Sequence, residues 1–101
     1  ISQFGIILIW VYLDVQQIIW TIILKTIYST KYRYMLTLLR EARELSGITQ
    51  LQLSEQLGKP QSYVSKYENG ERRLDVVEML YICEKIQTDP HTIVELIRNA
   101  E

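Results

Sequence analysis

The sequence predicts an all-α protein in which a bundle of five helices follows an apolar, helical N-terminal segment. In residues 33–101, apolar side chains recur every three or four positions between glycines and helix-capping residues. Residues 1–32 differ from this pattern, because they combine 20 apolar residues with only three charged ones. We therefore divide the chain into an apolar segment, 1–32, and a helical domain, 33–101.

The composition excludes several classes of protein. The 101 residues include 11 Lys and Arg and 12 Asp and Glu, so the net charge of −1 differs from that of a protein that coats nucleic acid. The single cysteine, Cys83, excludes a disulfide framework and a thiol zinc site. The single histidine, His91, leaves little scope for acid–base catalysis. We therefore expect no enzymatic activity, metal, cofactor or small-molecule ligand.

The apolar segment has the length of a membrane span. The 21 residues from Phe4 to Leu24 contain one charge, Asp14. Their 13 Ile, Leu, Val and Phe residues contribute about −4 to −8 kcal/mol on an insertion scale, while a central Asp costs about 3 kcal/mol. Insertion is therefore only marginally favourable. Lys25, Lys31 and Arg33 follow the apolar run and would keep the helical domain in the cytoplasm.

Two other interpretations fit the same segment. A helix here would carry one polar stripe and leave the rest of its surface apolar. The stripe is formed by Asp14, Gln17, Thr21 and Lys25. Such a helix would pack on a second copy or on the following domain, although residues 6–13 also suit a strand. We favour this packing helix over a membrane helix. The third interpretation takes residues 1–34 as sequence upstream of the natural domain, because the first methionine is Met35.

The helical domain begins with a helix at 33–46 that ends before Gly47. Its apolar face is predicted to comprise Met35, Leu38, Leu39, Ala42 and Leu45. Thr49, with Gln52 three residues later, forms a capping box that opens a second helix, and Gly58 ends that helix.

Three further helices follow in the same way. Pro60 suits the first turn of a third helix at 61–69, whose inward residues are Val64 and Tyr67 and which Gly70 closes. A capping box of Asp75 and Glu78 opens the fourth, with an apolar side of Val76, Met79, Leu80, Cys83 and Ile86. Asp89-Pro90 opens the fifth, with Ile93, Leu96 and Ile97 on its apolar side.

Two short helices joined by a tight glycine-containing turn form a helix-turn-helix pattern. The stretch LLREARELSGITQLQLSEQLGKPQSYVSKYENGERRLDVVEMLYICEKI resembles the phage repressor/Cro-type, or XRE, family of helix-turn-helix proteins. The matching positions are Arg43, Gly47, Thr49-Gln50, Leu53, Leu57-Gly58, Val64-Ser65, Glu68, Gly70 and Arg72. The resemblance covers about residues 33–98. It implies a five-helix bundle of the lambda-repressor-like type and a DNA-binding function.

The resemblance implies that the helix at 61–69 is the recognition helix, which enters the major groove. Its outward polar residues are the expected base contacts: Gln61, Ser62, Ser65 and Lys66. Glutamine can bond an adenine edge through two hydrogen bonds, lysine favours guanine, and serine is less selective. A solvated helix face is the alternative interpretation of these residues.

Two further sets of residues follow from the resemblance. Phosphate contacts are expected from Gln50, Tyr63, Asn69, Arg72 and Arg73. A structural salt bridge between Arg43 and Glu68 is expected to fix the recognition helix against the first helix. For Arg73, a solvated surface charge is nearly as good an interpretation.

The sequence departs from the family pattern at three places. Ser54 stands where alanine is usual, which we expect to change little. Lys59-Pro60 replaces a more common apolar residue followed by serine, so the recognition helix lacks its usual hydroxyl cap. Leu51 is apolar at a position that is usually polar, and a contact with the N-terminal segment would account for it.

The charges divide in a way that suits DNA binding. Residues 33–73 carry a net charge of +2 and residues 74–101 carry −4. We predict a sequence-specific regulator of transcription that binds double-stranded DNA, most simply a bacterial or phage-type repressor that acts in the cytoplasm as a homodimer. The alternatives are a protein-interaction module and a membrane-tethered regulator with the same fold.

Overall fold

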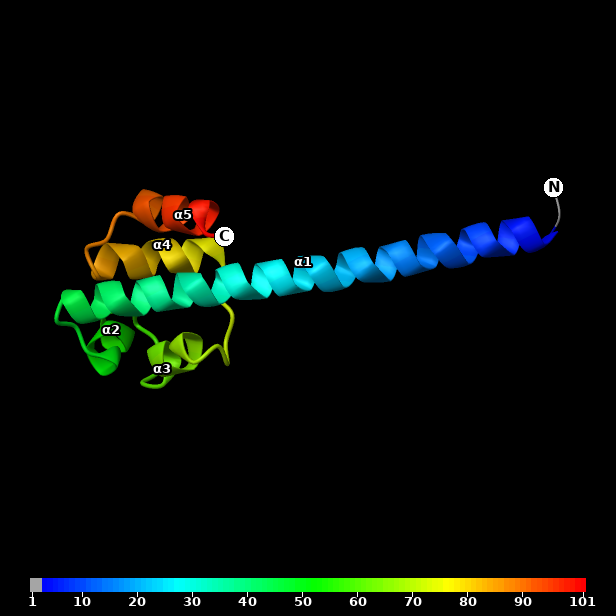
Figure 1. Ribbon diagram of the computed structural model, residues 1–101. Helices are drawn as coiled ribbons and strands as arrows, with labels where there is room; N and C mark the ends of the chain where they lie inside the picture. The colour runs from blue at the N-terminus through cyan, green and yellow to red at the C-terminus, as the bar shows by residue number, and fades with distance from the viewer. Residues whose placement is uncertain (1–2) are drawn as a thin grey trace. The chain divides into compact units, whose positions relative to one another are not determined.

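The computed structural model describes residues 3–101, apart from the side chains of residues 26–28. The first two residues of the predicted apolar segment therefore lie outside the described residues. The chain divides into two compact units, 1–30 and 31–101. The described residues form five α-helices and no strand, which confirms the predicted all-α class with its helical N-terminal segment (Figure 1).

Helix α1 runs from Gln3 to Leu45, so the predicted apolar segment and the predicted first helix are one element. The expected start at residue 33 is wrong because nothing in the sequence ends a helix before that point. The chain has no glycine or proline between Gly5 and Gly47, and those residues are the strongest helix breakers. The tract 6–13, which also suited a strand, is helical.

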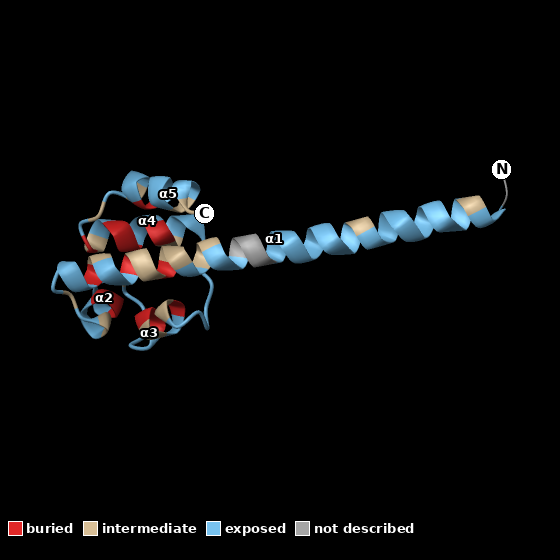
Figure 2. Ribbon diagram, in the orientation of Figure 1, coloured by how far each residue is buried: buried red, intermediate tan, exposed pale blue. Residues whose placement is uncertain are grey.

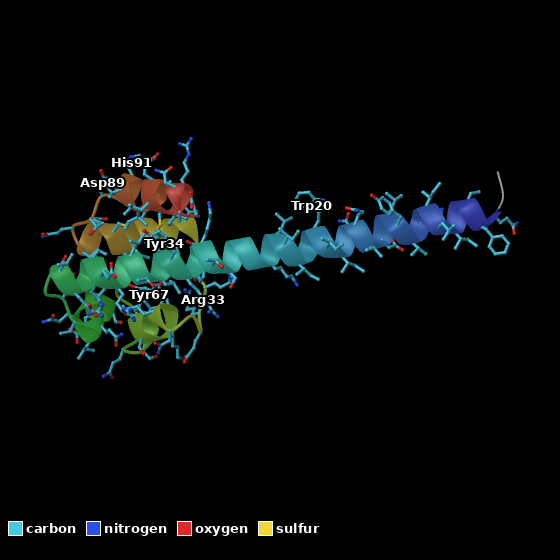
Figure 3. The ribbon with its side chains drawn as sticks, viewed as in Figure 1. Trp20, Arg33, Tyr34, Tyr67, Asp89 and His91 are labelled. Atoms are coloured by element: carbon cyan, nitrogen blue, oxygen red, sulfur yellow. The ribbon has the colours of Figure 1, made fainter. Side chains whose placement is uncertain are left out.

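The part of α1 in the first unit exposes its large apolar side chains. Phe4 is 77% exposed, and Trp20, labelled in Figure 3, is 58% exposed. On the predicted polar stripe, the Thr21 hydroxyl donates to the Gln17 carbonyl at 2.9 Å. By length and composition alone, α1 could cross a membrane, and no other helix in the described part of the chain could.

The second unit contains the hydrophobic core (Figure 2). The C-terminal turns of α1 contribute to it together with α2 (Gln50–Gln56), α3 (Tyr63–Glu68), α4 (Val76–Lys85) and α5 (Pro90–Asn99). Its buried members are Leu36, Leu39, Leu53, Tyr63, Val64, Tyr67, Met79, Ile82, Cys83, Ile86 and Ile93. The Tyr67 hydroxyl has no hydrogen-bond partner among the described residues, and burial raises the pKa of this group above its usual value.

Three helix faces differ from the sequence prediction. Leu45 is 89% exposed, because the buried face of α1 follows Leu36, Leu39 and Arg43 and Leu45 points away from it. In α4, Ile82 is buried, whereas Val76 and Leu80, predicted to face inward, are exposed. Leu96 of α5 is 42% exposed. Helical spacing identified the amphipathic helices correctly. It did not identify which apolar residues are buried where a helix carries apolar residues on more than one side.

Helices α1 to α4 end in the same hydrogen-bond pattern. In each, the N–H two residues beyond the C-cap bonds a carbonyl of the last turn, as Thr88 does to Cys83 at 2.9 Å at the end of α4. The residue before that donor is left-handed in every case: Gly47, Gly58, Gly70 and Gln87. Gln87, at φ 56°, is the only non-glycine among the described residues with positive φ, and its Cβ makes this conformation unfavourable.

We therefore expect Gln87→Gly to stabilise the second unit. Removing the Cβ relieves the left-handed strain, so the free energy of unfolding should rise by about 0.5–1 kcal/mol. Urea denaturation followed by circular dichroism measures this change, with Gln56→Gly inside α2 as the control that should be destabilising. A Gln87→Gly variant that unfolds more readily than the wild type would contradict the strain at this turn.

Candidate nucleic-acid interface

The helix-turn-helix pair consists of α2 and α3. Thr49 caps α2: its hydroxyl accepts from the Gln52 N–H at 3.1 Å, and the Gln52 side chain accepts from the Thr49 N–H at 2.9 Å. At the other end of α2, Gly58 adopts φ 66° and turns the chain toward α3. Local capping residues therefore fix both ends of the first helix of the pair.

The helix α3 is shorter than predicted. It begins at Tyr63, and Pro60 lies outside it, with its carbonyl accepting from the Tyr63 N–H at 2.9 Å in a turn. Ser62 has φ −88° and ψ 1°, the values of the third residue of a type I turn. The residues Gln61 and Ser62, expected in the first turn of the recognition helix, therefore lie in the turn that precedes it.

A serine from α2 completes the start of α3. The side chain of Ser62, the N-cap residue, makes no capping bond. Instead, the fully buried Ser54 hydroxyl accepts from the Val64 N–H at 3.2 Å. The expectation that Ser54 changes little is wrong, because its oxygen satisfies an N–H group in the first turn of α3 that would otherwise be buried without a partner.

The α3 region has one buried face and one polar exposed face. Val64 and Tyr67 are completely buried, and Figure 3 labels Tyr67 beside α1 and α3. Three of the four expected base-contact residues are exposed and Ser65 is half-buried; the four are Gln61, Ser62, Ser65 and Lys66. This segment therefore presents short or flexible polar groups to solvent from a rigid support.

The far end of α3 is joined to α1 by a buried ion pair. Arg43 Nε lies 2.9 Å from Glu68 Oε1, and the two side chains are only 9% and 2% exposed. Arg43 Nη1 also donates to the Ile48 carbonyl at 2.9 Å. The resemblance implied this pair, and its hydrogen bonds link α1 to the last residue of α3 and to the loop before α2.

Gln50, an expected phosphate contact, joins the same network. It is half-buried in the first turn of α2, and its Nε2 donates to Glu68 Oε2 at 3.3 Å. The bond orients the side-chain amide, so this glutamine also connects α2 to α3.

Tyr63 is not on the surface, contrary to the outward position expected of a phosphate contact. It is 6% exposed, and its hydroxyl donates to Glu78 Oε2 at 2.7 Å. Burial and the Glu78 carboxylate raise the pKa of Tyr63 to about 12. Sequence reasoning missed this role because Tyr63 meets its partner in α4, 15 positions along the chain.

The remaining expected phosphate contacts lie after α3. Asn69 is the exposed C-cap residue of α3. Arg72 Nη1 lies 2.7 Å from Glu78 Oε2, and its guanidinium carbon is 4.9 Å from the centroid of the Tyr63 ring. The Arg73 guanidinium carbon lies 4.5 Å from the centre of the Tyr32 ring. Both arginines are therefore held against aromatic rings.

Two positioning residues escaped the sequence analysis. Glu78 was recognised only as a capping residue of α4, although its second oxygen reaches Tyr63 and Arg72. Tyr32 was assigned to the apolar segment, although its hydroxyl accepts from the Leu74 N–H at 3.0 Å. No local signal identifies either role, because both depend on distant parts of the chain. Among the described residues, no group of three His, Cys, Asp or Glu side chains could hold a metal ion.

These features define a DNA-binding helix-turn-helix domain. The model of the helix-turn-helix family matches residues 39–93, more than half of the chain, so the chain belongs to this family. The match lies wholly within the second unit. Proteins of this class are typically not enzymes.

A solved structure identifies the branch of the family. The chain is 50% identical to an XRE-family like protein from Pseudomonas syringae pv. tomato str. DC3000, with a TM-score of 0.71. The match covers 73% of this chain and 90% of that chain. It confirms the resemblance to the XRE family and the lambda-repressor-like fold. No curated protein matches the chain.

We expect Glu68→Ala to destabilise the domain by about 3–5 kcal/mol, because it leaves the Arg43 guanidinium buried without its partner. DNA binding should be lost with it, since α3 is no longer fixed to α1. Glu44→Ala is the matched control, because Glu44 lies 3.8 Å from the same arginine but is 60% exposed; it should change stability by less than about 0.5 kcal/mol. Urea denaturation compares the two, and a Glu68→Ala variant with wild-type stability would show the pair to be unimportant.

Acid should weaken the contact between α3 and α4. The Asp75 N–H, the Tyr63 hydroxyl and Arg72 bind the Glu78 carboxylate and lower its pKa from 4.5 to about 2. The native state therefore gains stability from Glu78 above pH 4.5 and loses it as the pH falls toward 2. Wild type should lose about 1–2 kcal/mol more than Glu78→Gln between pH 5 and 2. Urea denaturation at pH 5 and at pH 2 measures the free energy of unfolding of both proteins. An equal loss of stability in wild type and Glu78→Gln would contradict the role assigned to the Glu78 carboxylate.

Proposed function

We propose that this protein is a sequence-specific regulator of transcription that reads the major groove with the segment from Gln61 to Lys66. The observation that supports this most directly is the division of this segment into two faces. Val64 is completely buried, while Gln61, in the turn before α3, and Lys66, on α3, are exposed, and α3 is held at both ends. A polar face on a rigid support is what reading of base edges requires.

Phosphate contacts would hold the domain on the duplex. Arg72 and Arg73 lie in the loop after α3, with Arg72 43% exposed at its side chain. Asn69 and the amide of Gln50 are the further candidates. Such contacts determine affinity and register, and they make binding sensitive to salt.

We further propose that two copies bind together and that the protein acts as a repressor. One such module buries little DNA surface, so two half-sites about 34 Å apart give a dimer far more affinity than one domain has. Helix α5 is one candidate dimer surface, because Val94 is 49% exposed on it, although Ile93 is buried in the core of its own chain. A dimer bound over a promoter would exclude RNA polymerase, which is the simplest route to repression.

A membrane-tethered form of the same regulator is the second candidate. It is favoured by the exposed apolar side chains of α1 and by the length of that helix, which could span a bilayer. In this form the DNA-binding unit would remain in the cytoplasm. The buried residues of the core all lie in 31–101. A shortened chain of residues 31–101 therefore keeps the core and the proposed DNA interface and lacks the proposed membrane tether.

Selection from a pool of random duplexes tests the proposal, run with the full chain and with residues 31–101. Both chains should enrich one sequence with two related half-sites, bound less tightly as salt rises. Gln61→Ala should weaken binding to that site by about tenfold but leave a scrambled site unaffected. Arg73→Gln should weaken both alike, with a salt slope smaller by about one.

Arg40→Gln is the control, since Arg40 is an exposed arginine of α1 that belongs neither to the proposed DNA contacts nor to α5. It should bind both duplexes as the wild type does. Failure to enrich any duplex would contradict DNA binding and favour a protein-interaction module.

A further inference from the structure

Arg72 is held in one place although nearly half of its side chain is exposed. Its Nη1 donates to Glu78 Oε2 at 2.7 Å and to the Arg73 carbonyl at 3.1 Å. Its guanidinium lies over the Tyr63 ring, 4.9 Å from the centroid. The donors on Nε and Nη2 have no partner among the described residues, although a guanidinium can donate five hydrogen bonds.

Glu78, which holds this arginine, is itself fixed in the first turn of α4. Its Oε1 accepts from the Asp75 N–H at 3.1 Å, and its Oε2 accepts from the Tyr63 hydroxyl at 2.7 Å. The carboxylate therefore joins the start of α4 to the start of α3. The Asp75 N–H and the Tyr63 hydroxyl that bind this carboxylate lower its pKa to about 2, so the group is ionised at neutral pH.

The position of this arginine matters for DNA. Tyr63 is the first residue of α3 and directly follows Ser62, one of the proposed base contacts. A cation fixed over the Tyr63 ring therefore lies beside the end of α3 that would enter the groove. Lys59 Nζ also lies over this ring, 5.6 Å from its centroid, but in the described part of the chain it forms no ion pair with Glu78.

We infer that Glu78 is a positioning residue for DNA binding, which holds Arg72 over Tyr63 so that its remaining N–H groups meet a backbone phosphate beside α3. An anion near DNA ordinarily repels the phosphates and weakens binding. Here the carboxylate strengthens binding, because it orders a side chain that would otherwise lose rotamer freedom on contact with DNA. A carboxylate that positions Arg72 should therefore strengthen DNA binding, whereas one that only repels the phosphates should weaken it.

Binding of the full chain to the selected duplex tests this inference, with Glu78→Gln made in three backgrounds. In the wild-type background the substitution should weaken binding about fivefold to tenfold. In the Arg72→Gln background it should weaken binding no further, because no arginine remains to be positioned. In the Lys59→Gln background, Glu78→Gln should again weaken binding about fivefold to tenfold, since Lys59 contacts the Tyr63 ring independently of Glu78.

Four outcomes would overturn the inference. Tighter binding by Glu78→Gln in the wild-type background would show that the carboxylate only repels DNA. Equal weakening with and without Arg72 would assign Glu78 a purely structural role. The inference rests on the proposed function, so a wild-type protein that binds no duplex at low salt would overturn both the inference and that function. If the wild type binds the selected duplex and Arg72→Gln binds it with the same affinity, only the inference is overturned.

Arg72→Lys keeps the test decisive if Glu78→Gln unfolds the domain. Lysine retains the positive charge but lacks the flat guanidinium that bonds Glu78 while lying over the Tyr63 ring. It should bind nearly as weakly as Arg72→Gln. Full wild-type affinity for Arg72→Lys would mean that charge alone is sufficient and that positioning has no part.

Discussion

The buried ion pair between Arg43 and Glu68 is the constraint on which the rest of the interface depends. Helix α3 has six residues, too few to be stable or oriented by its own hydrogen bonds. Glu68 is its last residue, and it bonds α1 through Arg43 and α2 through Gln50. Arg43 in turn holds the Ile48 carbonyl in the loop that leads into α2. One carboxylate therefore fixes the end of the short helix against both α1 and α2.

The opposite end of α3 is held by side chains from two other helices. Ser54 of α2 accepts from the Val64 N–H, and Glu78 of α4 accepts from the Tyr63 hydroxyl. Between these ends, Val64 and Tyr67 are buried in the core. The outward polar groups therefore sit on a segment whose position is set by α1, α2 and α4 together. Such rigidity reduces the entropy lost when the segment binds DNA.

Local chemistry made much of this fold predictable. Capping boxes at Thr49 and Asp75 and left-handed glycines marked helix ends, because each acts within a few residues of itself. Features that depend on distant partners were missed. The burial of Tyr63 was missed because Glu78 binds its hydroxyl from another helix, and the start of α3 was misplaced because Ser54 caps it from α2. The uninterrupted helix α1 was missed because charge marked a division in the chain where no residue breaks the helix.

The measurement that tests the central claim most directly is the change in backbone amide chemical shifts when the selected duplex is added to the protein. If the α3 segment reads DNA, the largest changes should fall on Gln61, Ser62, Ser65 and Lys66, with smaller ones at Arg72 and Arg73. Amides of α5, such as that of Val94, should move little except where a second copy packs. Changes confined to α4 and α5, with the α3 segment unaffected, would contradict the account.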